Sequence, residues 1–278
     1  MNAGLLVFIL LLLLSFLGIP IFISLGIGTL IALNMADLPM LVLPQKLFAG
    51  MNSSSLLAIP FFILAGNLMS RSITGKLIDV ANALIGRIKG SLALVTVVAS
   101  GLFGAISGSG PATVAALGII LIPAMINRGG FSAPFASSLM ASASSIAIVI
   151  PPSIAFVVYA SITGVSIADM FTAGIVPGIL MGVALVIVVM IEARKNNIQS
   201  SQKRASGKER WEAFKDAFWG LLMPVIILGG IYGGIFTPTE AAAVSVVYGL
   251  FVGIFIYREV SFKDLRGLLV ESGKTTGG

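Results

Sequence analysis

Long runs without a charged residue are the feature that most restricts how this chain can fold. Seven windows lack Asp, Glu, Lys and Arg altogether: 1–36, 47–70, 90–127, 129–168, 170–191, 217–239 and 241–257. Each approaches or exceeds the roughly 20 residues that a helix needs to cross a bilayer. With 57% hydrophobic and only 10% charged residues, the chain could not keep the surface of a soluble globule hydrated. The sequence therefore predicts an all-α polytopic protein embedded in a lipid bilayer.

Two residue types are absent, histidine and cysteine. Their absence excludes zinc sites built from His or Cys, cysteine nucleophiles, disulfides and Ser–His triads, and it disfavours an enzyme. The sequence pI of about 9.8 could suggest a nucleic-acid partner. The basic residues instead form short clusters between the apolar windows, which is typical of cytoplasmic loops, so no nucleic acid is expected.

The distribution of Lys and Arg predicts the orientation in the membrane. The segment 192–216 holds seven of the 17 basic residues, the segments 71–89 and 258–274 hold four each, and Arg128 stands alone. Placing these four regions in the cytoplasm leaves only Lys46 outside. This choice puts the N-terminus and residues 37–46 on the outer side.

The same choice fixes how often each window crosses. Residues 90–127 must begin and end inside, and their two halves of 17 to 19 residues are short for full spans, so a re-entrant hairpin is predicted. The next window must cross an odd number of times and has Pro151-Pro152 near its middle. Because a proline pair interrupts a helix, we expect one crossing at 131–163 built from two half-helices. Residues 170–191 then return to the inside.

Two apolar helices joined at a proline-containing break, followed by a charged amphipathic segment, occur twice. The breaks are Gly18–Pro20 and Phe236–Pro238. The first copy starts outside and the second inside, which is the inverted-repeat organisation of secondary transporters. On this interpretation the chain stops soon after its second repeat begins, and a second hairpin and a second broken helix would follow residue 278.

The tip of the predicted hairpin carries the first candidate site residues: Ser107, Gly108, Ser109, Gly110 and Thr113. Glycines let the backbone turn there, and hydroxyls and freed carbonyls offer oxygen ligands in an apolar region. Pro111 suits the first turn of the returning half-helix, whose N–H groups and dipole would favour an anion.

The break in the second element supplies the matching candidates: Ser145, Pro151, Pro152 and Ser153, with Ser142 and Ser144 nearby. Unwound carbonyls at this break could coordinate a small cation, and two such elements meeting at the midplane would make an ion-coupled substrate site. The alternative is that Gly and Ser merely allow close helix packing. A hydrolytic serine would need a base, and a phosphate loop would need GxxxxGK[ST]; neither is present near the tip.

Three further features have two interpretations each. Glu240 is either an intramembrane functional carboxylate or a cap in the first turn after Pro238, and the cap is preferred. Asn67 is either a ligand or an interhelical hydrogen-bonding residue. Residues 210–219 mix aromatic and charged side chains at helical spacing and are predicted to lie along the cytoplasmic interface.

Several stretches resemble the large membrane subunit of TRAP transporters, the tripartite ATP-independent periplasmic type. They are Ala58–Gly66, the hairpin Gly101–Pro123, the Ile150–Ser153 break and, most specifically, Gly229–Ala243 with its GIFTPTEAAA run. The resemblance covers essentially the whole chain. It implies a bacterial inner-membrane symporter for an organic acid, such as a C4-dicarboxylate, a sialic acid or a sugar acid. It also implies Na⁺ as coupling ion, a periplasmic substrate-binding protein, a small four-helix membrane subunit and an elevator motion.

Carried onto this sequence, the resemblance assigns a sodium site to Ser107, Ser109, Ser153 and nearby carbonyls. We expect residues 1–89 to hold scaffold helices and an arm, and 90–169 to form the transport elements. Residues 170–217 would be a return span with a cytoplasmic connector, and 218–278 the start of the second scaffold repeat. The alternatives are another ion-coupled anion transporter, a channel-like pore independent of a binding protein, and a structural anchor, which would not need broken helices.

Overall fold

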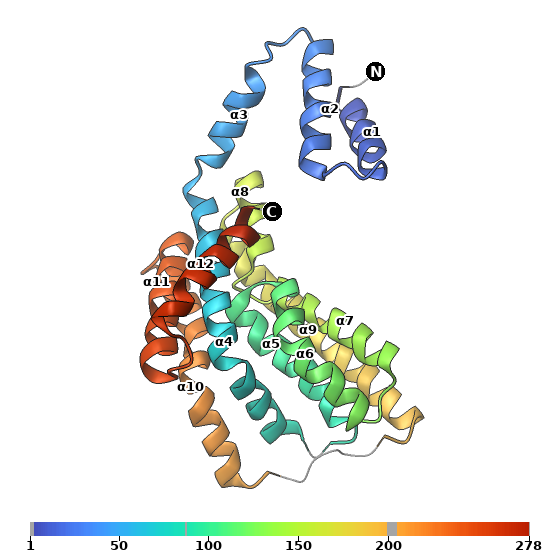
Figure 1. The fold of residues 1–278 in the computed structure, drawn as a ribbon, viewed down its shortest axis with the longest axis vertical. Coiled ribbons are helices and arrows are strands. Elements are labelled where there is room, and N and C mark those ends of the chain that lie inside the picture. Colours follow the sequence, from blue (N-terminus) through green and yellow to red (C-terminus); the bar gives the residue numbers. More distant parts are fainter. Residues whose placement is uncertain (1–2, 87, 199–204, 278) are drawn as a thin grey trace. The chain divides into compact units, whose positions relative to one another are not determined.

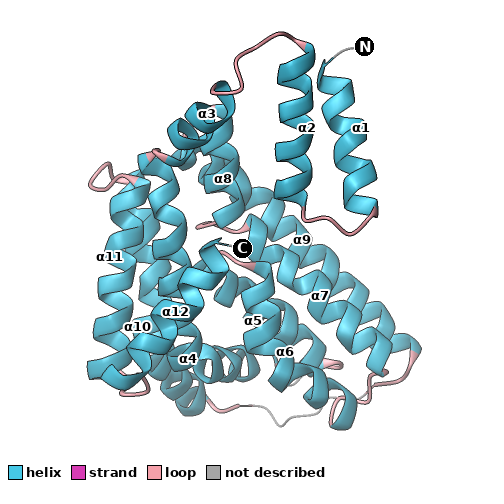
Figure 2. Ribbon diagram, turned by 45° about the horizontal axis from the view of Figure 1, so that its top comes forward, coloured by secondary structure: helices cyan, strands magenta, loops and turns pink. Residues whose placement is uncertain are grey.

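The computed structural model describes residues 3–86, 88–198 and 205–277. Every regular element in these ranges is a helix, as Figure 2 shows, which confirms the predicted all-α class. Arg87, Lys203 and Arg204, which contributed to the predicted orientation, lie outside the described residues. The chain divides into two compact units, residues 1–53 and 54–278.

The first unit is a helical hairpin followed by a short helix. Helices α1 (Ala3–Phe16) and α2 (Ile21–Met35) pack against each other, and α3 (Val42–Met51) follows. The turn between α1 and α2 lies at the predicted break, where Gly18 has a φ of +81° and Pro20 directly precedes α2. Most side chains of α1 and α2 are apolar and exposed, as expected for helices that face lipid or another membrane subunit.

The second unit contains the remaining helices. They are a 3₁₀ turn η1 (Ser54–Leu57), α4 (Ala58–Ile85), α5 (Ser91–Ser107), α6 (Gly110–Asn127), α7 (Ala133–Val149), α8 (Ile154–Thr163), α9 (Ile167–Lys195), α10 (Gly207–Tyr232), α11 (Pro238–Phe251), the π-helical turn η2 (Val252–Ile256) and α12 (Phe262–Gly277).

Helix α4 lies at the centre of this unit (Figure 1). It packs against α5 of the hairpin and, on other faces, against α10, α11 and α12. Helices α5, α6, α7 and α9 lie side by side, with α7 in contact with the other three. Close approaches depend on glycine, because a Cβ on Gly220 of α10 would lie 1.4 Å from Ile73 Cδ1 of α4.

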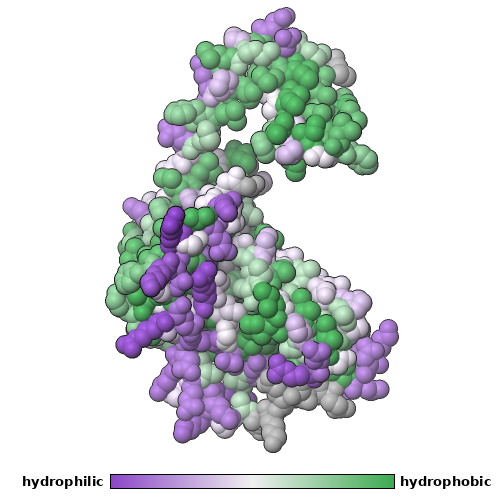
Figure 3. All heavy atoms as spheres, viewed as in Figure 1, coloured by the Kyte–Doolittle hydropathy of each residue, from purple (hydrophilic) through white to green (hydrophobic). Residues whose placement is uncertain are grey.

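Among the described residues, five helical stretches are long and apolar enough to cross a membrane: 54–85, 110–127, 167–195, 207–232 and 238–256. The pair α7 and α8 makes a sixth if it counts as one span, and its two parts are bent by 47° at the predicted proline break. Helices α5 and α6 pack together as a helical hairpin, whose re-entrant course in the membrane stays a prediction. Figure 3 shows hydrophilic side chains gathered over α12 and near the start of α10, with apolar side chains over much of the remaining visible face.

The charges of residues 71–89 predict a cytoplasmic loop. This prediction is wrong for residues 71–85, because they continue α4 as a helix. The charges of this segment are tolerated because acidic residues after α11 face them. Arg71 lies 3.7 Å from Asp264, and Lys76 Nζ lies 2.5 Å from Glu259 Oε1. Neither partner is close in sequence, so the charge pattern alone could not reveal this pairing.

The repeated element order is present in the structure. Two apolar helices and a third helix occur as α1, α2 and α3, and again as α10, α11 and the amphipathic α12. The inverted relation between the two copies stays a prediction.

Candidate functional site

The hairpin tip is built by a glycine that ends one helix and a serine that begins the next. Gly108 has left-handed backbone angles, with a φ of 61°, and its N–H donates to the Gly104 carbonyl at 2.8 Å. Glycine is the residue that adopts this helix-ending conformation without steric cost. Ser109 is then extended, and its Oγ accepts the Ala112 N–H at 3.4 Å at the start of α6.

The other hydroxyls of the tip are held by local hydrogen bonds. Ser107 Oγ accepts the Ser109 N–H at 3.4 Å, and Thr113 Oγ1 donates to the Ser109 carbonyl at 2.8 Å. Ser107 and Thr113 are buried, whereas Ser109 is partly exposed. A hydroxyl oxygen has two lone pairs, so Ser107 and Ser109 each retain one for a cation.

At the helix break, two prolines follow the end of one helix and a serine begins the next. Pro151 and Pro152 have no N–H, so the carbonyls of Ala147 and Ile148 lose their helical donors. Ser153 compensates on both sides, because its Oγ donates to the Ile148 carbonyl and accepts the Phe156 N–H at 3.3 Å as the cap of α8.

The structure brings the tip and the break into direct contact. The Ile154 N–H at the start of α8 donates to the Gly108 carbonyl at 3.3 Å, and a Cβ on Gly108 would lie 2.4 Å from the Pro152 carbonyl oxygen. The contact continues along α5 and α7, where a Cβ on Gly104 would lie 2.4 Å from Ala147 Cα. These distances mean that only glycine fits at both hairpin positions.

Four helix ends meet at this contact. The carbonyl ends of α5 and α7 and the N–H ends of α6 and α8 lie at residues 107–110 and 149–154. Carbonyl ends carry partial negative charge and favour a cation, while N–H ends carry partial positive charge and favour an anion. The same place can therefore accommodate both a small cation and a carboxylate.

A pocket of about 320 Å³ opens beside the contact. Its lining includes Gly108, Ser109 and Gly110 of the hairpin, Ile148 and Ile154 beside the break, and Thr275 and Thr276 of α12. The two threonines were not among the predicted site residues. In the sequence they are only a pair of adjacent hydroxyl side chains at the end of an amphipathic segment. The sequence does not show that this segment lies beside the hairpin.

The predicted site residues are therefore only partly together. Ser107, Gly108, Ser109, Gly110, Pro151, Pro152 and Ser153 belong to the contact, and Thr113 lies one turn into α6. Ser145 is half-buried on α7 and does not line the pocket. The carbonyl oxygen of its neighbour Ser144 lies close to the hairpin tip, since it would be 3.3 Å from a Cβ on Gly110.

Two residues with open interpretations have structural partners. Glu240 forms a capping box with Thr237, accepting the Thr237 N–H at 2.8 Å while Thr237 Oγ1 accepts the Glu240 N–H at 3.3 Å. This geometry supports the capping interpretation. Asn67 Nδ2 of α4 donates to Ser272 Oγ of α12 at 2.9 Å, so it makes an interhelical hydrogen bond.

Comparison with known proteins identifies the family. Residues 7–278 match the family described as the tripartite ATP-independent periplasmic transporter, DctM component. The chain is 40% identical over 286 residues to the C4-dicarboxylate TRAP transporter large permease protein DctM of Rhodobacter capsulatus, covering 97% of this chain and 64% of that protein. It is 47% identical over 294 residues to the Vibrio cholerae protein of the same name, covering 98% and 64%.

A third relative is the 2,3-diketo-L-gulonate TRAP transporter large permease protein YiaN of Escherichia coli, with 40% identity over 263 residues, 93% of this chain and 61% of that protein. The chain thus spans just under two thirds of the length of these relatives. It is a multi-pass protein of the inner membrane, and it belongs to the family of TRAP transporter large permeases.

Proposed function

We propose that this chain contributes a cation and substrate site to a sodium-coupled transporter that takes up an organic acid. The observation that most supports this proposal is the hydrogen bond from the Ile154 N–H to the Gly108 carbonyl, which joins the hairpin tip to the helix break. Four helix ends converge there within an apolar membrane protein. Such convergence supplies the ligands that an ion and a carboxylate require in lipid.

Sodium is the proposed coupling ion because the oxygens at the contact come from hydroxyls and carbonyls. These are hard ligands without a proton to exchange near neutral pH, and the chain has no histidine. Ser107, Ser109, Ser153 and nearby backbone carbonyls are the proposed ligands.

The proposed substrate class is an organic acid because the N–H ends of α6 and α8 favour a carboxylate. Relatives are named for C4-dicarboxylate, isethionate, ectoine and 2,3-diketo-L-gulonate transport, most of which are organic acids. A C4-dicarboxylate, a sialic acid or a sugar acid would fit this class. The proposed partners are a periplasmic substrate-binding protein and a small four-helix membrane subunit, as the tripartite family name supports.

An elevator motion is the proposed mechanism. The hairpin and the broken helix are fastened to each other at Gly104, Gly108 and Gly110, where no side chain could be accommodated without displacing a neighbour. Two elements joined this closely would move as one body and carry the ion and substrate between them. The paired helices α1 and α2, and α10 and α11, would supply the scaffold.

Uptake by the intact transporter in proteoliposomes tests this function. The assay would include the small subunit and the binding protein and compare a panel of labelled acids with and without an inward sodium gradient. Uptake of one acid that requires both the gradient and the binding protein is expected. Flux that persists without either would contradict the proposal and favour a channel-like pore.

A further inference from the structure

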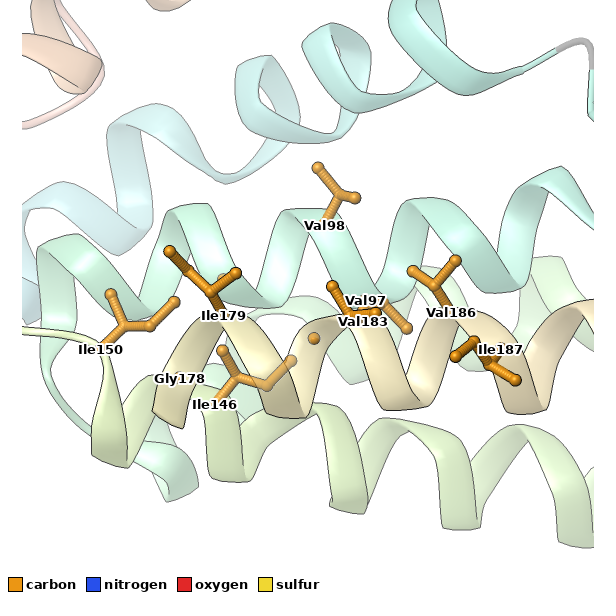
Figure 4. A pocket seen from close by; sticks show the side chains of 11 residues that line it. Val97, Val98, Ile146, Ile150, Gly178, Ile179, Val183, Val186 and Ile187 are labelled. Atoms are coloured by element: carbon orange, nitrogen blue, oxygen red, sulfur yellow. The ribbon is translucent and has the colours of Figure 1, made fainter. Parts of the chain in front are cut away.

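A second cavity lies away from the hairpin tip, on the other side of α5 and α7. It is an apolar groove of about 300 Å³ between α5, α7 and α9 (Figure 4). Its lining consists of Val97, Val98, Gly101, Ile146, Ile150, Gly178, Ile179, Gly182, Val183, Val186 and Ile187. None of these side chains carries a polar atom, so the groove suits a hydrocarbon chain and not the transported acid.

The groove exists because two of its lining residues are glycines, which leave open space between the larger side chains around them. A Cβ on Gly182 would find only Ile146 Cδ1 within 4 Å, at 3.9 Å, and a Cβ on Gly101 would find only Ile150 and Ile146 methyl groups at 3.8 and 3.9 Å. Both positions therefore have open space above them. Three α9 side chains that border the groove, Ile179, Val183 and Ile187, are apolar and exposed.

One end of the groove leads to a group of cations, here called the basic rim: Lys89, Arg194 and Lys195. The lining residues of α9 occur at positions 178/179, 182/183 and 186/187, and Arg194 and Lys195 lie about two turns further along the same helix. Lys89 is next to Gly90, where a Cβ would lie 2.8 Å from Ala193 Cβ. The fold therefore places all three at the same end.

The basic rim is free to bind an anion. All three side chains are exposed, and within the described residues none of them forms an ion pair. The nearby carboxylate of Glu192 is already engaged, because its Oε1 accepts Asn196 Nδ2 at 2.7 Å.

The spacing matches one leaflet of a bilayer. Gly178 and Arg194 lie on the same helix, and at about 1.5 Å per residue the distance between them is about 24 Å. Half of a bilayer with its headgroup region measures about 20–22 Å. An acyl chain in the groove would thus place its phosphate at the basic rim.

We propose that this groove and the basic rim form a binding site for an anionic phospholipid, with an acyl chain between α5, α7 and α9 and the phosphate at Lys89, Arg194 and Lys195. Such a lipid would fill a gap on the outer surface of the hairpin and broken helix without entering the transport site. Basic clusters at the cytoplasmic ends of membrane helices attract anionic lipids in this way.

Native mass spectrometry of the intact purified transporter tests the site. The probes are dioleoyl phosphatidylglycerol and dioleoyl phosphatidylcholine, which share acyl chains and differ in charge. The unchanged protein should retain phosphatidylglycerol preferentially. Each of Lys89→Gln, Arg194→Gln and Lys195→Gln should lower its affinity about fivefold, which corresponds to about 1 kcal/mol per basic residue near an anionic surface.

Filling the groove tests the acyl chain separately. Gly182→Leu should lower retention of both lipids at this site, since its side chain occupies the open space. Two controls should leave retention unchanged: Lys208→Gln, whose exposed side chain lies at the start of α10, and Val188→Ile, at an exposed position of α9 that does not line the groove.

Unchanged phosphatidylglycerol retention in the triple Gln variant would overturn the proposal, whether or not Gly182→Leu folds. So would a cross-link from Val183→Cys to a helix of another subunit, because the groove would then hold protein. Either result leaves the sodium test of the transport site unaffected, so the two proposals fail separately.

Discussion

At the residue scale, glycine decides where the two halves of the site can meet. Gly108 and Gly164 both have a positive φ, 61° and 77°, and both follow the last turn of a helix. They differ in surroundings. A Cβ on Gly108 would overlap the Pro152 carbonyl, whereas a Cβ on Gly164 has nothing within 4 Å.

This pair gives a matched prediction. Gly108→Ala and Gly164→Ala should pay the same backbone cost of about 1–2 kcal/mol for a left-handed alanine. Only Gly108→Ala should also push the hairpin tip away from the break, reducing uptake at least tenfold while the protein still inserts. Uptake per inserted molecule is the measurement, and equal activities of the two variants would show that the contact is not needed.

The sequence could predict the tip and the break, because SGSG and Pro151-Pro152 interrupt apolar helices by local chemistry alone. It could not predict that Thr275 and Thr276 line the same pocket or that Ser145 does not. Both facts depend on how α12 and α7 are turned about their own axes in the packed unit. Long-range contacts, such as the hydrogen bond from Asn67 to Ser272, determine these orientations.

At the element scale, helix ends explain what charge patterns could not. Helix α4 continues past Arg71 because partners from after α11 neutralise its charges, so its length is a tertiary effect. The start of α11, by contrast, is encoded locally. Thr237, Pro238 and Glu240 form a capping box with proline in the first turn.

The capping box yields a second prediction, which separates capping from transport. Glu240→Gln keeps an acceptor for the Thr237 N–H and should retain most uptake. Thr237→Ala removes the side-chain cap and should lower stability by about 1 kcal/mol. Thermal unfolding and uptake should be measured on both variants. A Glu240→Gln protein that is stable but inactive would show that the carboxylate has a role in transport and is not only a cap.

At the scale of the whole molecule, the account predicts a single orientation. Residues 37–46 should lie outside and 192–216 inside, because this places 16 of 17 basic residues in the cytoplasm. Since the sequence has no cysteine, single cysteines can report each side. Met40→Cys should react with an impermeant maleimide from the periplasm, and Asn197→Cys only after the cytoplasmic face is opened. The reverse pattern would refute the orientation.

The central claim is that the contact between hairpin and break holds the coupling sodium, and sodium activation of uptake tests it most directly. Ser109→Ala removes a proposed ligand together with the cap of α6. Ser132→Ala removes the equivalent cap of α7, where Ser132 Oγ accepts the Phe135 N–H at the same 3.4 Å, away from the site.

The measurement is the sodium concentration that gives half-maximal uptake in proteoliposomes. It should rise about 5- to 30-fold in Ser107→Ala and Ser109→Ala, which corresponds to a lost ligand of about 1–2 kcal/mol, and it should not change in Ser132→Ala. An unchanged sodium requirement in both site variants, or uptake driven by a pH gradient alone, would contradict the account.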